Sequence, residues 1–348
     1  MERLTLIRPD DWHAHLRDGP ILSAVAAATA RHFARAIVMP NLSPPVTTTA
    51  QAAAYRERIR AALPQGSTFE PLMTAYLTDH SDPADLAAGH ASGVLTAVKL
   101  YPAGATTNSQ AGVTRIDGLD RVFDKLSHIG MPLLIHAEVV DPDVDVFDRE
   151  AVFIEREFVR LHQRFPELRM VFEHVTTRAG VEFIRAAGAS VAGTITPHHL
   201  STNRNALFRG GIRPHYYCLP IAKREEDRAA LVQAAVGGEA KFFLGTDTAP
   251  HPRARKESDC GCAGVYNAPT ALATYAQVFA AADALARLED FASRFGPRFY
   301  GLPENTATVT LRRVAPQEPP ADLTVGDDTI RIFVPEQPLE WVVEAPGD

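Results

Sequence analysis

Asp11-Trp12-His13-Ala14-His15-Leu16-Arg17 is a polar segment that follows the first short apolar run of the chain, Leu4–Ile7. Further apolar runs of similar length recur along the sequence, and polar side chains follow most of them. Short apolar runs are typical of strands that are buried on both faces. We therefore predict eight strands: Leu4–Ile7, Ala36–Met39, Leu72–Leu77, Thr96–Leu100, Leu133–Ile135, Met170–Phe172, Val191–Ile195 and Phe242–Leu244.

Longer segments with helical patterning separate these runs. They cover Ile21–Arg31, Thr49–Leu63, Pro83–Ser92, Asp117–Ile129, Asp148–Phe165, Arg178–Ala187, Glu225–Val236 and Ala268–Ala286. Strands that alternate with helices favour a parallel sheet, and eight such units predict an α/β fold of the (β/α)₈ TIM-like barrel type. The alternative is an open doubly wound sheet. No Gly-x-Gly-x-x-Gly follows the first run, which disfavours the dinucleotide-binding form of that alternative.

The pattern changes after about residue 300. Three prolines between Val314 and Leu323 favour an extended linker, and Thr308–Leu311 and Thr329–Val334 are predicted as short strands. We therefore expect a barrel over residues 1–302 and a small C-terminal extension, 303–348, packed on it.

Composition restricts the class of protein. The 348 residues are 46% hydrophobic and 22% charged, an ordinary globular mixture. The net charge is 35 − 42 = −7, so a nucleic-acid partner is not expected. There is no apolar run long enough to span a membrane and no secretory leader, and a cytoplasmic location is expected. The three cysteines, Cys218, Cys260 and Cys262, form neither a disulfide framework nor the spacing of a zinc ribbon.

The polar residues at the ends of the predicted strands suggest a site. In a barrel all parallel strands end at one rim, where active sites lie. Six strands would deliver to this rim His13, His15, Asn41, Lys99, His136, His174 and Asp247, with His251 shortly after.

The spacing of His13 and His15 favours a metal site. In extended chain, residues two apart point the same way, and two converging imidazoles suit a divalent cation. His136, His174 and Asp247 at equivalent strand ends strengthen that interpretation. The alternative is that each histidine is an ordinary core residue. That explanation would have to apply separately to several histidines at the same rim.

Lys99 does not fit a metal site as an ammonium, because divalent cations would repel it. It could instead be an ion-pair partner or a lysine that extends away from the strand. Carboxylation by CO₂ would turn it into an anionic carbamate whose two oxygens could bridge two metals.

The chain resembles the shorter, monofunctional class of bacterial dihydroorotases in the amidohydrolase superfamily. The resemblance runs from about residue 4 to 302. Small departures are Ala14, where a leucine is common, and Thr248, where a serine is common. The matching stretches are Arg8–Gly19, Val38–Leu42, Lys99–Pro102, Phe172–His174, Leu244–His251 and Arg255–Gly264.

This resemblance implies a site with two Zn²⁺ per subunit. His13 and His15 would bind one metal with Asp247, His136 and His174 would bind the second, and N6-carboxylated Lys99 would bridge them. Arg17, Asn41 and His251 would hold the substrate carboxylate, and the backbone near Leu219 and Ala263 would meet the ring amides. His15 and His136 would also lie against the substrate. Thr106 and Thr107 would belong to a mobile loop that covers the site.

The implied activity is the reversible cyclisation of N-carbamoyl-L-aspartate to L-dihydroorotate in pyrimidine synthesis. A hydroxide that bridges the metals would be the nucleophile, and Asp247 would be the general acid and base. A homodimer that acts on a small molecule is expected. The alternatives are another cyclic-amide hydrolase such as a hydantoinase, and a catalytically dead scaffold of the same fold. A hydantoinase need not place Arg17, Asn41 and His251 together, and a scaffold should have lost metal ligands.

Overall fold

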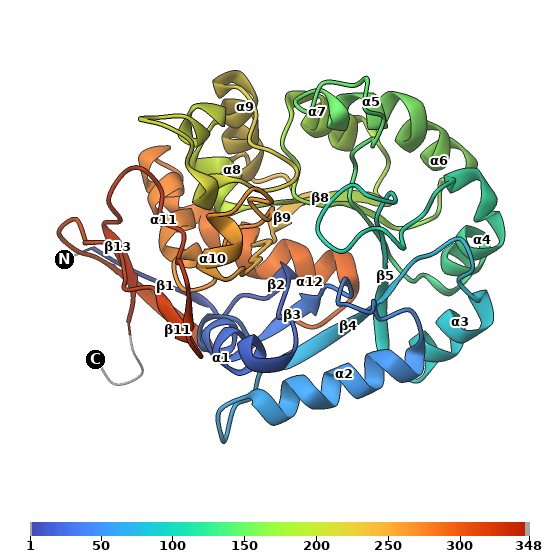
Figure 1. Cartoon of the computed structure of the whole chain (residues 1–348), viewed down its shortest axis with the longest axis horizontal. Helices are drawn as coiled ribbons and strands as arrows, with labels where there is room; N and C mark the ends of the chain where they lie inside the picture. The colour runs from blue at the N-terminus through green and yellow to red at the C-terminus, as the bar shows by residue number, and fades with distance from the viewer. Residues whose placement is uncertain (1, 345–348) are drawn as a thin grey trace.

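The computed structural model describes residues 2–344 and shows a barrel of eight parallel strands surrounded by helices (Figure 1). The strands follow one another around the sheet in sequence order. This confirms the predicted (β/α)₈ barrel. The barrel strands are β2 (Asp11–Ala14), β3 (Arg35–Val38), β4 (Glu70–Tyr76), β5 (Leu95–Leu100), β6 (Leu133–Ile135), β7 (Met170–Phe172), β8 (Val191–Ile195) and β9 (Phe242–Leu244).

The barrel closes between β9 and β2 through the residues just after β9. The Asp247 N–H donates to the His13 carbonyl at 2.9 Å, and the His15 N–H donates to the Thr248 carbonyl at 3.0 Å. The Asp11 carboxylate, buried at the start of β2, accepts from the Thr246 N–H at 2.8 Å. The hydrogen bonds that close the barrel therefore also fix three candidate metal ligands relative to one another.

Helices cover the outside of the barrel, close to the predicted ranges. Capping residues explain where several of them begin and end. Thr48 and Gln51 form a capping box at the start of α2, and Gly130 ends α4 in the left-handed conformation. The main helices are α1 (Leu22–His32), α2 (Thr49–Ala62), α3 (Pro83–Ala91), α4 (Asp120–Ile129), α5 (Arg149–Phe153) with η3 (Ile154–Phe158) and α6 (Val159–Arg164), α7 (Arg178–Ala186), α9 (Glu225–Val236) and α11 (Ala271–Ala281).

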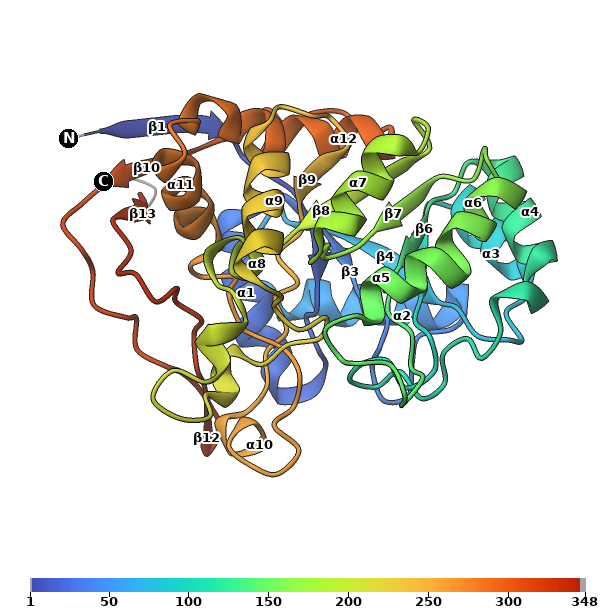
Figure 2. The ribbon, with the colours of Figure 1, turned by 90° about the horizontal axis from the view of Figure 1, so that it is seen from above.

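Short helical elements lie in the connections along the chain and before the extension. They are η1 (Gly19–Ile21), η2 (Ile116–Gly118), α8 (Pro197–Ser201), η4 (Arg204–Leu207), η5 (Pro214–Tyr216), α10 (Arg253–Lys256), η6 (Leu285–Arg287), η7 (Asp290–Arg294) and α12 (Phe295–Tyr300). Figure 2 shows α12 at one end of the barrel and α10 at the opposite end. No helix within residues 2–344 is both long and apolar enough to cross a membrane.

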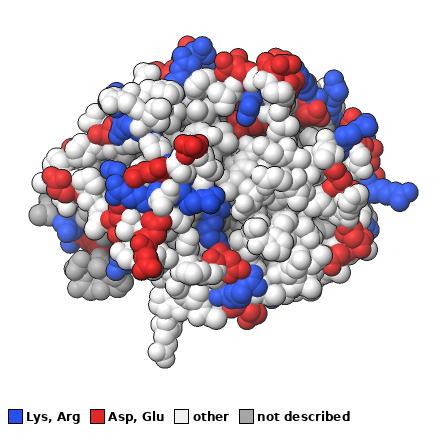
Figure 3. All heavy atoms as spheres, viewed as in Figure 1, with Lys and Arg blue, Asp and Glu red and all other residues white. Residues whose placement is uncertain are grey.

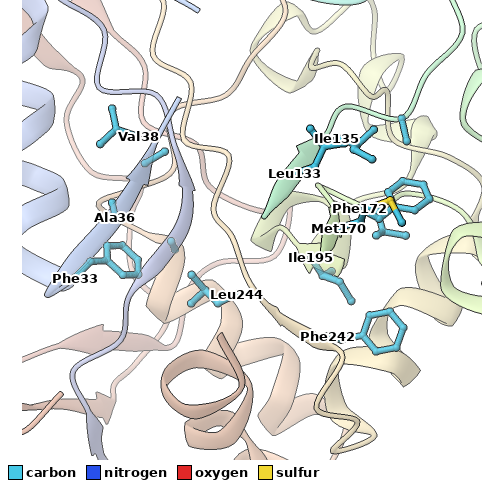
Figure 4. Close-up of a cluster of buried hydrophobic side chains, with 14 of the residues drawn as sticks. Phe33, Ala36, Val38, Leu133, Ile135, Met170, Phe172, Ile195, Phe242 and Leu244 are labelled. Carbon is cyan, nitrogen blue, oxygen red and sulfur yellow. The ribbon is translucent and has the colours of Figure 1, made fainter. Parts of the chain in front are cut away.

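Alternation along the strands divides the core into two layers. Leu133, Ile135, Met170 and Phe172 point outward and pack under the helices, where Phe242 and Leu244 also lie (Figure 4). The residues between them point into the barrel and form a second cluster with Trp12 and the α12 residues Phe295 and Tyr300. The inward residues of the strands are Ile37, Leu72, Ala97, Leu134, Val171, Ala192 and Phe243.

This alternation also explains how the site is assembled. Lys99, His136 and Glu173 each lie two residues after an inward apolar residue, namely Ala97, Leu134 and Val171. Because side chains alternate with a period of two, these three polar side chains also point into the barrel. Apolar side chains thus fill one end of the barrel, and polar side chains occupy the other.

The prediction that Leu4–Ile7 is the first barrel strand is wrong. The structure places β1 (Arg3–Ile7) in a separate antiparallel sheet with β10 (Thr308–Arg313) and β13 (Trp341–Val343). Arg3 and Thr5 of β1 are exposed and Leu6 is buried, which is the alternation of a sheet with one face in solvent. The true first barrel strand carries His13 itself.

The C-terminal extension therefore packs with the start of the chain. The strand predicted at Thr308–Leu311 is confirmed as β10, and the one predicted at Thr329–Val334 is shorter, pairing as β12 (Asp328–Ile330) with β11 (Leu323–Val325). Trp341 of β13 is buried. The boundary between residues 302 and 303 stays a prediction. Strand β1, from the start of the chain, joins the sheet of the extension.

On the face of the molecule shown in Figure 3, acidic and basic side chains are interspersed.

Candidate active site

Residues at the carboxyl ends of the barrel strands surround one small cavity. All six candidate metal ligands are buried, with exposed fractions between 0% for Lys99 and 7% for His15. Five of them line the cavity, and Lys99 is not among the lining residues. The cavity is lined by His13, His15, Arg17, Asn41, Tyr101, Thr106, Thr107, His136, His174, Leu219, Asp247, Ala249, Ala263 and Gly264. The structure thus brings together the residues that the sequence predicted at this rim.

His13, His15 and Asp247 form the tightest group. His13 Nε2 and His15 Nε2 are 3.2 Å apart, and Asp247 Oδ1 lies 3.2 Å from the first and 3.1 Å from the second. These separations match the roughly 3.3 Å edge of a tetrahedron of nitrogen or oxygen ligands about a zinc ion. The three atoms are therefore spaced as ligands of one cation.

The partners on the far side of each ring decide which nitrogen carries the hydrogen. His15 Nδ1 lies 2.8 Å from Asn41 Oδ1, and His13 Nδ1 lies 2.9 Å from Glu173 Oε2. Both partners are acceptors. The His15–Asn41 contact is a hydrogen bond, whereas the His13–Glu173 contact is a close approach without hydrogen-bond geometry. In the neutral form of each ring that carries its hydrogen on Nδ1, the lone pair lies on Nε2. Two lone pairs and a carboxylate oxygen then converge on one point, which is what a divalent cation requires.

Electrostatics in the site also favour a cation. Burial lowers the pKa of His13, but Glu173 and Asp247 outweigh it and raise that pKa to about 9. Burial lowers the pKa of His15 to about 4 and that of His174 well below its usual value. Without a metal, the carboxylates thus draw positive charge onto His13, while the other two rings stay neutral and available as ligands.

His136 and His174 form the second part of the site. Their ring centroids are 4.8 Å apart, and the His174 ring lies 5.1 Å from that of His13. Glu138 Oε2 lies 2.8 Å from His136 Nε2. Donor atoms of His13, Glu173 and His174 lie within 4.8 Å of one another and form a second group that could hold a cation, and His136 is not a member of that group.

Lys99 contacts the Glu173 carboxylate, which also lies beside His13. Its Nζ donates to Glu173 Oε2 and lies 4.8 Å from the centre of the Tyr101 ring. Burial lowers the pKa of Lys99, although Glu173 opposes the shift. A lowered pKa increases the fraction of neutral amine, and the neutral amine is the form that reacts with CO₂.

Backbone strain is concentrated in the site. Arg17, His174 and Asp247 have φ values of +59°, +43° and +46°, a region that side chains other than glycine rarely adopt. The strand therefore turns sharply at each of these residues. This turn directs the side chain over the end of the barrel and not along its outer surface.

Arg17, His251 and the backbone of Ala263 lie together on one side of the cavity. His251 Nε2 lies 2.9 Å from the Ala263 carbonyl and 3.1 Å from Arg17 Nη2. Burial, followed by the Arg17 charge, lowers the pKa of His251 to about 2, so this ring is neutral. Nε2 cannot both donate to the carbonyl and accept from the guanidinium. An anion between Arg17 and His251 would give both donors an acceptor.

The segment Pro102–Gly112 covers the cavity. The Asn41 amide donates to the Thr107 carbonyl at 2.9 Å, and the Thr107 hydroxyl donates to the Ala263 carbonyl at 3.2 Å. With the segment in this position the cavity measures about 20 Å³, enough for roughly one water molecule. A larger molecule can enter only after the segment has moved away.

The same segment is held by its own internal contacts, although most of its residues are small and polar. Ser109 is fully buried, and its Oγ accepts from the Thr106 N–H at 2.8 Å. A side chain at Gly112 would collide with the Tyr101 carbonyl, 2.3 Å from an added Cβ. The segment is a compact turn that could move as a unit.

Leu219, the remaining expected substrate contact, also lines the cavity. The carbonyl of the next residue, Pro220, lies 3.0 Å from Nε2 of the buried His199.

Three buried residues of the site were given no role by the sequence: Glu173, Glu138 and Tyr101. Glu173 follows strand β7 directly and contacts both His13 and Lys99. The sequence did contain an indication of this role for Glu173, because a buried lysine such as Lys99 requires an acidic partner. The phenol of Tyr101 lines the cavity and has no hydrogen-bond partner among the described residues.

Comparison with known proteins agrees with this geometry. Residues 5–315 match the model of the amidohydrolase family. The dihydroorotase of Chelativorans sp. is 58% identical over 345 residues, which is 99% of this chain and all of that protein. The chain belongs to the dihydroorotases of the amidohydrolase family.

Solved structures distinguish this group from its nearest alternative. The dihydroorotase of Saccharomyces cerevisiae, solved with 5-fluoroorotic acid, is 32% identical with a TM-score of 0.89, and 99% of each chain is covered. The L-hydantoinase of Arthrobacter aurescens is 17% identical with a TM-score of 0.78, covering 98% of this chain and 83% of its own. The hydantoinase therefore shares the fold alone, whereas the dihydroorotases share both fold and sequence.

Proposed function

We propose that this amidohydrolase is a zinc-dependent dihydroorotase that interconverts N-carbamoyl-L-aspartate and L-dihydroorotate. The observation that carries the proposal is the pairing of two features in one cavity. A cluster of three converging acceptor atoms suits a cation, and the Arg17–His251 pair beside it suits the carboxylate of the substrate. High identity to dihydroorotases over the whole chain supports the same activity.

The proposal includes a pair of divalent cations, and the group His13, His15 and Asp247 supports the first of them. His13, His15 and Asp247 would hold one, His136 and His174 would hold the other, and carboxylated Lys99 would lie between them. When bound, such cations activate water and polarise the carbonyl of a cyclic amide. The secondary carbamate would keep one N–H, and this N–H could still donate to Glu173, so the modification preserves the contact seen in the structure.

Asp247 would move the proton. Its pKa is held well below the usual range, mainly by His13 and against the effect of burial, so it is a carboxylate at neutral pH. In hydrolysis it would accept a proton from the attacking water and deliver it to the leaving amide nitrogen. In cyclisation the same group would run these transfers in reverse.

Closure of the Pro102–Gly112 segment would remove bulk water from the reaction. It would also bring the hydroxyls of Thr106 and Thr107 to the bound substrate. The backbone at Leu219 and Ala263 would meet the ring amides, and Asn41 would help to bind the carboxylate. A homodimer and a cytoplasmic location belong to the same proposal and would be tested by sedimentation and by cell fractionation.

The decisive experiment is an assay of dihydroorotate hydrolysis, followed by the loss of ultraviolet absorbance, with and without a chelator. We expect activity that the chelator abolishes and added zinc restores. Hydantoin is the matched alternative substrate. Turnover of hydantoin in preference to dihydroorotate would contradict the proposal, as would full activity after complete removal of metal.

Arg17→Gln should weaken substrate binding without changing metal content. Loss of a buried charge-assisted contact costs on the order of 2–5 kcal/mol, so kcat/KM for carbamoyl aspartate should fall roughly 30- to 5,000-fold. The exposed Arg58, paired with Asp18 at 2.8 Å, offers a matched control. Arg58→Gln should have near-normal kinetics, and near-normal kinetics in Arg17→Gln would refute the assignment.

Replacing both Thr106 and Thr107 by valine should lower kcat while metal content stays unchanged. Two hydrogen bonds would be lost, at about 1–3 kcal/mol in all, or roughly 5- to 150-fold in rate. Thr114, whose hydroxyl donates to Asp79 outside the cavity, provides the control Thr114→Val. If the double variant kept wild-type kcat and KM, the segment would be only a connection between elements.

A further inference from the structure

Cys260 and Cys262 form a close pair of thiols beside the active site. Their Sγ atoms are 3.2 Å apart, and both cysteines are free. Gly261 between them has φ +64° and Cys262 has φ +23°, so the backbone turns tightly and brings both side chains to the same side. A disulfide requires Sγ atoms about 2.05 Å apart, so a shift of about 1 Å would join them.

The two thiols differ in access to solvent. Cys260 is exposed, whereas the Cys262 side chain is buried. The pKa of the Cys260 thiol is lowered, first by hydrogen bonds from Cys262 and then by the positive charges of Arg255 and Lys256. The third thiol, Cys218, is buried, and burial raises its pKa to about 12. Cys260 is therefore the thiol of the pair that an oxidant in solution can reach.

The turn that holds this pair is part of the wall of the active site. Ala263 directly follows Cys262, and its carbonyl contacts both His251 and Thr107. The buried Lys256 ammonium donates to the carbonyls of Tyr217, Cys262 and Gly264, at 2.8, 2.8 and 2.9 Å. A movement of Cys262 would therefore be transmitted to Ala263 and to the covering segment.

We propose that Cys260 and Cys262 are a site of reversible oxidation by peroxides, forming an intramolecular disulfide that weakens substrate binding. Nothing in the proposed reaction needs either thiol. The pair instead makes the shape of the active site depend on the concentration of oxidant in solution.

The chemistry balances with hydrogen peroxide as the oxidant. The Cys260 thiol loses its proton, the thiolate attacks one peroxide oxygen, the O–O bond breaks, and a sulfenic acid and hydroxide result; the hydroxide takes up the released proton and becomes water. Cys262 Sγ then attacks Cys260 Sγ, the S–S bond forms, the S–O bond breaks, and a second water leaves. Two thiols thus give up two electrons and two hydrogens, and a dithiol reductant reverses the step.

The first test is a mass and thiol measurement on the metal-loaded enzyme, and it does not depend on any activity. We expect stoichiometric peroxide to lower the intact mass by two hydrogens and to reduce the free thiols from three to one. Dithiothreitol should restore both. Addition of two oxygens at Cys260, or three thiols that survive the treatment, would overturn the proposal.

The second test concerns the effect on the site and rests on the proposed function. Oxidation should lower kcat/KM for dihydroorotate roughly 10- to 100-fold, mainly through KM, because small displacements of binding groups have effects of this size. Metal content should stay constant, and dithiothreitol should restore activity.

Cys260→Ser is the matched variant, since this exposed side chain contacts Cys262 Sγ and is not among the residues that line the cavity. It should have normal activity before treatment and keep it afterwards, without the loss of two hydrogens. Cys218→Ala should still show that mass loss, because Cys218 is not in the pair. Parallel inactivation of the wild type and Cys260→Ser would overturn the proposal, as would a disulfide that leaves kcat/KM unchanged.

Discussion

The Lys99→Ala variant should lose both metal and activity. We expect fewer than one bound divalent ion per chain in place of two, and a fall in kcat/KM for dihydroorotate of about 10³-fold or more. The physical reason is that, in the proposed site, only the carbamate on Lys99 would supply anionic oxygens to both cations. Metal analysis and the hydrolysis assay on the same sample measure both effects.

A small carboxylic acid should partly restore activity in this variant, since a free carboxylate can occupy the space of the missing side chain. Lys125 on α4 is half-buried and distant from the rim, so Lys125→Ala is the control for loss of a lysine. Thermal unfolding should be recorded as well, because Glu173 loses its Lys99 contact. Two retained metals with full activity would exclude the carbamate.

Asp247→Asn should reduce kcat by about 10²–10⁴-fold in both directions, the range of general acid–base catalysis. In the wild type, the two directions should have opposite pH trends. Hydrolysis needs the carboxylate, so its rate falls as pH drops through the pKa of Asp247. Cyclisation needs the protonated form, so its rate falls as pH rises above that pKa.

Rates of hydrolysis and cyclisation measured across the same pH range test this assignment. Metal content of Asp247→Asn must be determined, because Asp247 is also a candidate ligand. Glu257 accepts from Arg253 outside the cavity, and Glu257→Gln is a suitable control for loss of a carboxylate. Parallel pH trends in the two directions would contradict a single acid–base group.

Much of the barrel could be predicted because burial imposes a local pattern. Seven of the eight predicted strands overlap barrel strands, and the eight helical segments each overlap a helix. The candidate rim followed from the same pattern, because parallel barrel strands end on one side and deliver their next side chains there. This reasoning placed His136 and His174 correctly at the cavity.

The pattern failed at Leu4–Ile7, because an apolar run shows that a strand is buried and not which sheet it joins. Leu4 and Leu6 can be buried in an antiparallel sheet as well as in a barrel. The pairing with Thr308–Arg313 depends on residues about 300 positions away. Such long-range pairing has no local signal.

The sequence alone determined which residue types meet at the rim and, through the period of two, that His13 and His15 share a side. Only the tertiary structure decided their surroundings. It set Glu173 against both His13 and Lys99, forced positive φ at Arg17, His174 and Asp247, and closed the covering segment on Asn41 and Ala263. Strand and helix patterns reflect the burial of each residue and its near neighbours. Contacts across the barrel depend on how every strand and loop packs at once, which is why they appear only in the fold.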